Sequence, residues 1–164
     1  MLRRATRLIG AIIATLLLGA CSAPARQSEP PAAQVLFVCE HGNVKSLMAA
    51  SYFNQLARER GLPFRGIARG VAPDSTSVPD AIVEGLRRDG FDVNEFHPAP
   101  VGASDLSSSQ RVITIGTPLP AIAQPGGLVL ERWDDVPPAS VDYGSARDAL
   151  KSHVDKLVEQ LAHP

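Results

Sequence analysis

The sequence predicts an α/β domain in which helices cover both faces of a parallel sheet. Short apolar runs alternate with segments whose apolar residues recur at helical spacing, and this alternation is typical of βαβ units. About 130 residues follow an N-terminal leader and a Pro-rich segment, which is enough for one domain with one core. In folds of this kind, ligands bind at the carboxyl ends of the strands.

The first elements follow one another as strand, helix and strand. Residues 35–38 are consecutively apolar, which is typical of a central parallel strand. A helix is expected from Ser46, which would cap it, to about Arg60, because its apolar residues lie on one face. The sequence GLP at residues 61–63 ends this helix, and residues 64–69 form the second predicted strand.

The remaining elements continue this alternation. Pro79 begins a helix at its first-turn position, and Gly90 ends it. Residues 111–115 predict a third buried strand and residues 128–133 a fourth. A last helix is expected over residues 144–162, where apolar residues again recur at helical spacing.

Residues 1–20 have the pattern of a secretory signal peptide. Three arginines precede an apolar run of eleven residues, 8–18, which is shorter than the roughly 20 residues that a membrane-spanning helix needs. The sequence LGAC that follows resembles the bacterial lipobox, and this implies cleavage before Cys21 and lipidation of that cysteine, with palmitate among the acyl chains. An ordinary secretory signal with a chance cysteine is the alternative. Residues 21–33 are rich in Pro, Ala, Ser and Gln and are expected to form a flexible tether.

This leader predicts a lipid anchor in the bacterial cell envelope. Ser22 follows Cys21 at the position where inner-membrane lipoproteins carry aspartate, so the periplasmic side of the outer membrane is the expected location. Without the three leader arginines, 13 basic residues remain against 17 acidic ones, which argues against nucleic acid as a partner. Any site for an anion must therefore be built locally.

The segment VLFVCEHGNVKS, residues 35–46, places one thiol at the end of a predicted strand. After Cys39, a loop with a glycine leads into a predicted helix, so backbone N–H groups and the positive helix end point at the thiol. Such surroundings favour a thiolate and bind a tetrahedral anion beside it. If Cys21 is acylated, Cys39 is the only free thiol and no internal disulfide forms. A buried, inert cysteine is the alternative to a functional one.

Several segments between residues 34 and 163 carry a family resemblance. They are the Cys-x5-Lys-Ser loop of residues 39–46 followed by LMAASYF, and the segments IARGVAP, PDAIVEGLRRDGFDV, VITIG and ERWDDVPP. Together they resemble the low-molecular-weight protein tyrosine phosphatases and the related thioredoxin-coupled arsenate reductases. The resemblance implies a three-layer α/β/α fold of the phosphotyrosine protein phosphatase I type. It further implies a four-stranded parallel sheet in the order 2-1-3-4 within residues 34–164.

The resemblance assigns roles to individual residues. Cys39 would attack phosphorus to form a cysteinyl-phosphate intermediate, and Ser46 would donate its hydroxyl to the thiolate. Asp134 or Asp135 would protonate the leaving oxygen and then activate water, unless both are solvated loop charges. Lys45 stands where the family has its catalytic arginine. The loop residues expected to bind the oxyanion through their N–H groups are Glu40, His41, Gly42, Asn43 and Val44.

The loop also departs from the family pattern. Lys45 keeps the positive charge but lacks the planar fork that grips two oxygens, a loss expected to cost about 2–4 kcal/mol in the transition state. Gly42 takes the position at which the family usually has asparagine, and a left-handed backbone suits glycine well. Asn43 follows one position later. His41 either adds positive charge and sorts substrates or faces solvent, and the solvent-facing orientation is favoured. Since no cysteine follows Cys39, an internal disulfide relay is excluded.

The sequence-based hypothesis is a lipid-anchored phosphatase that hydrolyses a phosphomonoester. The expected partner besides the membrane is a phosphoprotein, with phosphotyrosine as substrate, or a phosphorylated small molecule. The first alternative is a module that binds oxyanions without turnover, and the second is an arsenate reductase that uses an external thiol. No cofactor is expected, and no Cys/His cluster has the spacing of metal ligands.

Overall fold

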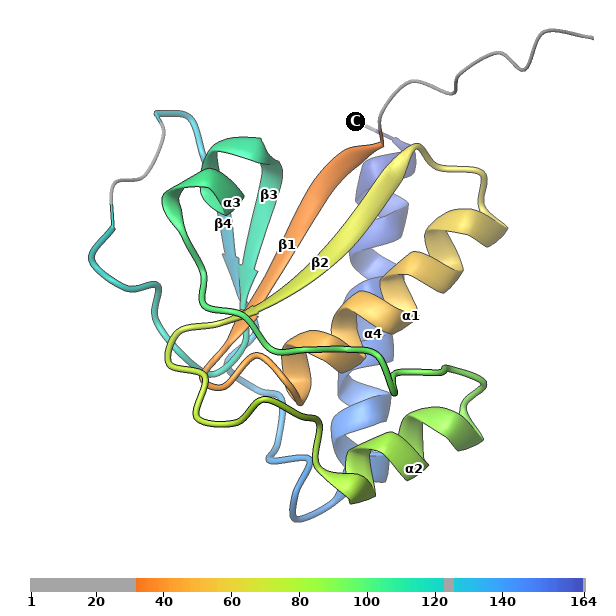
Figure 1. Ribbon diagram of the computed structural model, residues 1–164. Coiled ribbons are helices and arrows are strands. Elements are labelled where there is room, and N and C mark those ends of the chain that lie inside the picture. The colour runs from red at the N-terminus through yellow and green to blue at the C-terminus, as the bar shows by residue number, and fades with distance from the viewer. Residues whose placement is uncertain (1–31, 123–125, 164) are drawn as a thin grey trace, which may run out of the picture.

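A four-stranded parallel sheet organises the chain, with the strands in the spatial order β2-β1-β3-β4 (Figure 1). The computed structural model describes residues 32–122 and 126–163. The strands are β1 (Ala33–Cys39), β2 (Phe64–Gly70), β3 (Ser109–Thr114) and β4 (Val129–Arg132). The helices are α1 (Lys45–Glu59), α2 (Asp80–Arg88), α3 (Ala103–Ser108) and α4 (Tyr143–Ala162). The parallel pairing and the strand order confirm the prediction.

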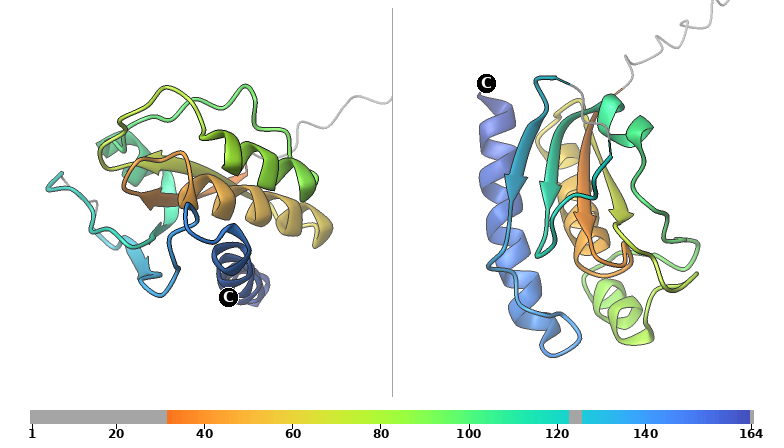
Figure 2. Two further views of the ribbon diagram at one scale, coloured as in Figure 1. Left: turned by 90° about the horizontal axis from the view of Figure 1, so that it is seen from below. Right: turned by 90° about the vertical axis from the view of Figure 1, so that its left-hand side faces the viewer.

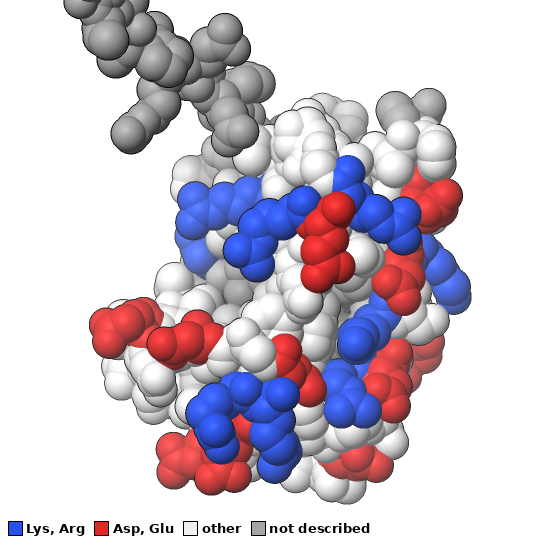
Figure 3. Space-filling model, turned by 90° about the vertical axis from the view of Figure 1, so that its right-hand side faces the viewer, with Lys and Arg blue, Asp and Glu red and all other residues white. Residues whose placement is uncertain are grey.

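The helices are distributed unequally over the two faces of the sheet (Figure 2). α1 and α4 cover one face, where α1 packs against both β2 and α4, and α2 lies beyond the carboxyl ends of the strands, against the start of α4. Among the described residues, the other face carries the six-residue α3 and connecting segments. This side buries a smaller core, made of Leu36, Val38, Val101, Leu106 and Val112. On the helix side, Lys and Arg side chains are interspersed with Asp and Glu side chains (Figure 3).

β1 is buried on both of its faces, as its apolar run predicts. Val35, Phe37 and Cys39 belong to the larger core, while the residues between them belong to the smaller one. Because side chains alternate along a strand, Cys39 points to the face on which α1 lies. Phe37 anchors this face through ring contacts with Phe53 and Trp133, at centroid distances of 5.5 and 5.7 Å.

Two helices differ in detail from the expectation. α1 begins at Lys45 with Val44 at its cap position, so the prediction of Ser46 as the helix cap is wrong. The Ser46 side chain is turned inward instead, where it is fully buried. The short α3 was not predicted, and Asp105 stabilises its start by accepting a 2.9 Å hydrogen bond from the Gly102 N–H.

β4 is an exposed edge strand, which corrects the prediction of a fourth buried strand. Within the described part of the sheet it pairs with β3 alone. Val129 and Leu130 are 47% and 44% exposed. An edge strand beside the thinly covered face leaves apolar side chains in solvent, and an apolar run by itself does not reveal this position.

The predicted leader lies outside the described residues. This applies to residues 1–20, to Cys21 and to most of the tether, so the signal peptide and the lipid anchor stay predictions. β1 begins at Ala33, the last residue assigned to the tether. No helix in the described part of the chain has the length and apolar character needed to cross a membrane.

Candidate active site

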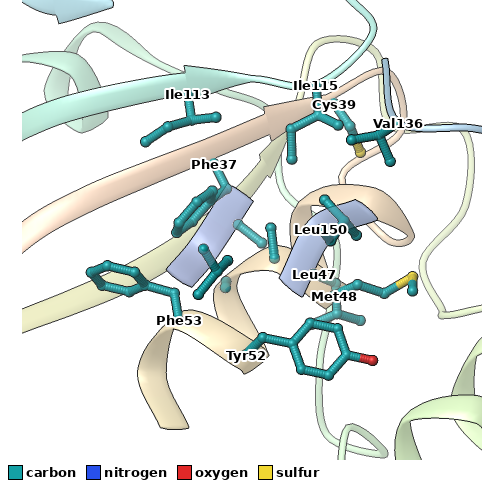
Figure 4. Close-up of a cluster of buried hydrophobic side chains, with 14 of the residues drawn as sticks. Phe37, Cys39, Leu47, Met48, Tyr52, Phe53, Ile113, Ile115, Val136 and Leu150 are labelled. Carbon is teal, nitrogen blue, oxygen red and sulfur yellow. The ribbon is translucent and has the colours of Figure 1, made fainter. Parts of the chain in front are cut away.

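Cys39 lies at the carboxyl end of β1, close to Ile115 and Val136 (Figure 4). Its side chain is 3% exposed and the thiol is free. The Gly42 N–H donates to the sulfur at 3.3 Å, and Ser46 Oγ lies 3.1 Å from the same sulfur. Both groups are able to donate a hydrogen bond to a thiolate, the nucleophilic form of cysteine. The predicted contact between Ser46 and the thiol is therefore present.

The loop between β1 and α1 packs directly against the end of β2. Gly42 has a φ of +78°, which confirms the expected left-handed backbone. A Cβ on Gly42 would lie 2.5 Å from the Gly70 nitrogen, and a Cβ on Gly70 would lie 2.6 Å from the carbonyl carbon of His41. Contacts this short with backbone atoms leave room for no side chain. The two glycines together therefore allow the loop to lie where it does.

Asn43 and Val44 support the loop through their side chains. Asn43 is 4% exposed, and its Nδ2 donates to the Ser77 carbonyl at 2.9 Å. Val44 is partly buried against the larger core. The side chains of both residues are thus used in packing, and only their backbone N–H groups are left to bind an oxyanion, as the sequence predicted.

Lys45 extends from the start of α1 to the turn that follows β3. A Cβ on Gly116 would lie 2.6 Å from Lys45 Nζ, so the ammonium occupies the space that glycine leaves open. No carboxylate among the described residues forms an ion pair with Lys45. Its charge is consequently available to an anion bound beside the thiol.

A pocket of about 170 Å³ is lined by both Cys39 and Lys45. It is lined by Cys39, Glu40, His41, Val44 and Lys45 from the loop and α1, and by Pro138, Ala139 and Ser140 from the segment after β4. The sequence pointed to the first group. It gave no chemical signal for the second, whose small and apolar side chains belong to no catalytic motif.

The two predicted acids do not line this pocket. Asp134 Oδ2 forms an ion pair with Arg132 at 2.9 Å. Asp135 Oδ1 lies 2.7 Å from His153 Nε2, and this hydrogen bond holds the pKa of Asp135 below its ordinary value. A carboxyl group with a lowered pKa is a poor proton donor. Both predicted acids are thus engaged by other side chains, and their catalytic role stays a prediction.

Packing against Trp133 explains the position of Asp135. Trp133 is 1% exposed, and its Nε1 donates to Glu131 Oε1 at 2.6 Å. The His153 ring, on α4, stacks on Trp133 with a centroid distance of 4.7 Å and an interplanar angle of 13°. The stacked His153 then binds Asp135, which ties the segment after β4 to α4.

Glu40 and His41 are the titratable side chains that line the pocket together with Cys39 and Lys45. Glu40 Oε2 accepts a 2.9 Å hydrogen bond from Thr117 Oγ1. His41 Nδ1 lies 3.3 Å from a carboxylate oxygen of Asp74. Sequence reasoning used only the backbone of Glu40 and favoured a solvent-facing His41. It missed Asp74 and Thr117, because each lies far from the loop in sequence.

The comparisons with known proteins agree with this geometry. A family model described as low molecular weight phosphotyrosine protein phosphatase matches residues 34–119. Comparison with curated proteins gave no match. Among solved structures, YfkJ from Bacillus subtilis is similar with a TM-score of 0.71 and 20% identity, over 82% of this chain and 98% of that one.

Two arsenate reductases are also structurally similar. The enzyme from Archaeoglobus fulgidus has a TM-score of 0.60 and 26% identity, over 76% of this chain and 98% of that one. The thioredoxin-dependent enzyme from Corynebacterium glutamicum has a TM-score of 0.67 and 20% identity over 82% of this chain. The match covers 64% of the Corynebacterium enzyme, so this chain spans less than two thirds of that protein's length.

Proposed function

The chain belongs to the low molecular weight phosphotyrosine protein phosphatase family, and we propose that it hydrolyses phosphomonoesters through a cysteinyl-phosphate intermediate on Cys39. One observation carries this proposal. The buried sulfur lies 3.3 Å from the Gly42 nitrogen and 3.1 Å from Ser46 Oγ, at the base of a pocket that also contains Lys45. A thiol in these surroundings is suited to attack phosphorus rather than to fill space in the core.

The proposed reaction uses the loop as an anion site. A phosphate beside Cys39 would meet the N–H groups that precede α1, and this helix has neither a capping side chain nor an acidic residue in its first turn. Lys45 would add a positive charge next to the equatorial oxygens. Lysine supplies a point charge rather than a planar fork, so transition-state binding is expected to be weaker than with arginine.

Aryl esters, phosphotyrosine among them, are the proposed substrate class. Neither Asp134 nor Asp135 lines the pocket, so little help from these carboxylates is expected when the ester oxygen leaves. A phenol has a pKa near 10 and leaves far more easily than an aliphatic alcohol. The small volume of about 170 Å³ further favours a compact group next to the phosphate.

Hydrolysis of p-nitrophenyl phosphate tests this proposal. Cys39→Ser should abolish turnover, because serine is a much weaker nucleophile at neutral pH. Lys45→Arg should raise kcat/KM by about 30-fold or more, because it restores the bidentate grip whose loss is expected to cost about 2–4 kcal/mol. Lys151→Arg, on the exposed side of α4, is the matched control and should change nothing. If the wild type and Lys45→Arg are both inert at acidic and neutral pH, the chain is not a phosphatase.

A second candidate is an oxyanion-binding module without turnover. Two observations favour it, namely the lysine at position 45 and the positions of both predicted acids outside the pocket. Calorimetry with phosphate, sulfate, arsenate and phosphotyrosine distinguishes the two functions. Measurable affinity without hydrolysis supports a binding module, whereas saturable hydrolysis excludes it.

An arsenate reductase coupled to an external thiol is the third candidate, and the similarity to two arsenate reductases supports it. With no cysteine after Cys39, an arsenate adduct on that residue would have to be resolved by glutathione or a glutaredoxin. Release of arsenite in the presence of these reductants is the corresponding assay.

The lipid anchor is proposed from the leader alone. Labelled palmitate should be incorporated into the wild-type chain when it is expressed with its leader, and Cys21→Ala should prevent this. The anchor would place the phosphatase on the periplasmic side of the outer membrane.

A further inference from the structure

His41 is a side chain of the thiol pocket whose orientation is fixed from outside the loop. It follows Cys39 by two positions and lines the same pocket. Its Nδ1 lies 3.3 Å from Asp74 Oδ1 and 3.3 Å from the Ala72 carbonyl oxygen. Both acceptors belong to the segment after β2, which is joined to the loop by backbone hydrogen bonds of 2.9 and 2.8 Å.

These contacts determine which ring nitrogen can take part in chemistry. The Ala72 carbonyl oxygen can only accept, so Nδ1 carries the hydrogen that it receives, and the Asp74 carboxylate lies beside the same nitrogen. Nε2 has no hydrogen-bond partner among the described residues and is the nitrogen left for a ligand. A histidine held at Nδ1 by a carboxylate is the arrangement that enzymes use to orient a proton donor or acceptor.

The other residues of the pocket are less suited to this task. Val44, Pro138 and Ala139 carry no proton that can be exchanged, and the ammonium of Lys45 is needed as a fixed charge. Asp134 and Asp135 are paired with Arg132 and His153 outside the pocket. Glu40, which binds the Thr117 hydroxyl, is the remaining competitor.

We infer that His41, held by Asp74, is the proton donor and acceptor for the reaction at Cys39. This inference rests on the proposed phosphatase function and deepens it. In this proposal a histidine of the thiol loop, rather than Asp134 or Asp135, donates and accepts the proton.

The proposed hydrolysis has two steps, formation and breakdown of the cysteinyl phosphate. The Cys39 thiolate forms a bond to phosphorus while the bond from phosphorus to the aryl oxygen breaks. Protonated His41 gives its Nε2 proton to that oxygen, and a phenol leaves. Water then attacks phosphorus and passes one proton to neutral His41, while the bond between sulfur and phosphorus breaks. Inorganic phosphate leaves, and both the thiolate and the protonated histidine are restored.

The test compares leaving groups in one set of variants of the full domain. His41→Ala should lower kcat/KM by about 100-fold for phenyl phosphate but by less than about 5-fold for 2,4-dinitrophenyl phosphate, whose leaving group needs no proton. Added imidazole should restore part of the activity of His41→Ala, which a merely structural role would not allow. Asp74→Asn should show the same pattern with a smaller loss.

Two controls are built into the chain. His97 is also exposed, and its Nδ1 lies 3.2 Å from the Thr76 carbonyl oxygen, but it does not line the pocket. His97→Ala should therefore behave as the wild type. Glu40→Gln should leave the dependence on the leaving group unchanged, and thermal unfolding of each variant shows whether it is folded.

Three outcomes overturn the inference. If His41→Ala loses equal activity on all esters and gains nothing from imidazole, His41 is structural while the proposed phosphatase function stands. If Glu40→Gln shows the selective loss instead, the proton carrier is Glu40. If neither the wild type nor Lys45→Arg hydrolyses even the dinitrophenyl ester, the phosphatase function and the role of His41 both fail.

Discussion

The loop before α1 and the segment after β4 line the same pocket, yet their conformations have different origins. The turn of the loop is encoded mainly by its own residues, since Cys39 ends a buried strand and Gly42 adopts a φ of +78°, while Gly70 of β2 leaves room for it. The segment after β4 is determined by distant partners, because His153 on α4 binds Asp135. The difference shows that a short motif encodes backbone geometry, whereas the role of a side chain depends on what the rest of the chain brings to it.

Gly42→Ala should have the largest effect, because it changes the backbone of the loop before α1. The added Cβ would lie 2.5 Å from the Gly70 backbone nitrogen, and a left-handed alanine is itself strained. We expect a loss of about 2–4 kcal/mol in the free energy of unfolding and loss of hydrolysis, because the Gly42 N–H moves away from the sulfur. Urea unfolding and the p-nitrophenyl phosphate assay measure both effects.

Gly61→Ala separates the effect of a left-handed backbone from the effect of the short contact between Gly42 and Gly70. Gly61 also has a positive φ, +64°, but nothing lies within 4 Å of its missing Cβ. This variant should lose only about 1–2 kcal/mol and keep its activity. Equal losses in the two variants would mean that the approach of the loop to β2 contributes nothing to the site.

Gly116→Ala should weaken anion binding in addition to the strain that a left-handed alanine brings to the fold. The new Cβ would lie 2.6 Å from Lys45 Nζ, the end of a flexible side chain that can move aside. The ammonium would then leave its place near the thiol, and we expect phosphate to bind about 10-fold more weakly in calorimetry.

Gly90→Ala is the matched variant for this prediction. Its φ is +91° and its missing Cβ has no neighbour within 4 Å, so it should show similar strain with unchanged phosphate affinity. Unchanged affinity in Gly116→Ala would show that Lys45 does not contribute to anion binding.

The same contrast explains how far the sequence predicts this molecule. Apolar runs and helical spacing depend on neighbouring residues, so the parallel sheet was predicted correctly from them, whereas its strand order and the left-handed Gly42 were predicted from the family resemblance. Edge exposure of β4 and the capping of α1 depend on tertiary position, and both were predicted incorrectly. The contact of Ser46 with the thiol followed from the family resemblance rather than from local pattern.

The pocket could be predicted only in part, for a physical reason. Cys39 and Lys45 belong to one motif that folds as a unit. Asp74, by contrast, reaches His41 from the segment after β2, a contact between residues more than 30 positions apart. The spacing of residues in the sequence does not predict such a partner, and it does not predict the pairing of Asp135 with His153 either.

Asp135→Asn should have the smallest effect, and it tests whether the contact with His153 positions the segment after β4. Because the hydrogen bond from His153 lowers the pKa of Asp135 in the folded state, the ionised carboxylate stabilises the fold above the unfolded pKa near 4. This contribution is lost as pH falls through the lower folded pKa. Since the Asp135 side chain is 72% exposed, its removal should cost less than about 1 kcal/mol at pH 7, and this cost should shrink as the pH falls through the folded pKa.

Activity separates this structural role from the catalytic role that the sequence suggested. If Asp135 serves only to tie the segment after β4 to His153, Asp135→Asn should keep kcat/KM for phenyl phosphate within about 2-fold of wild type, far from the 10²- to 10⁴-fold loss expected for a proton donor. Asp134→Asn, which removes only an exposed pair with Arg132, should do the same at every pH. A selective loss of activity on phenyl phosphate in either variant would show that the substituted aspartate is the proton donor. Such a loss would require a rearrangement of this segment in the complex with substrate, because neither carboxylate lines the pocket.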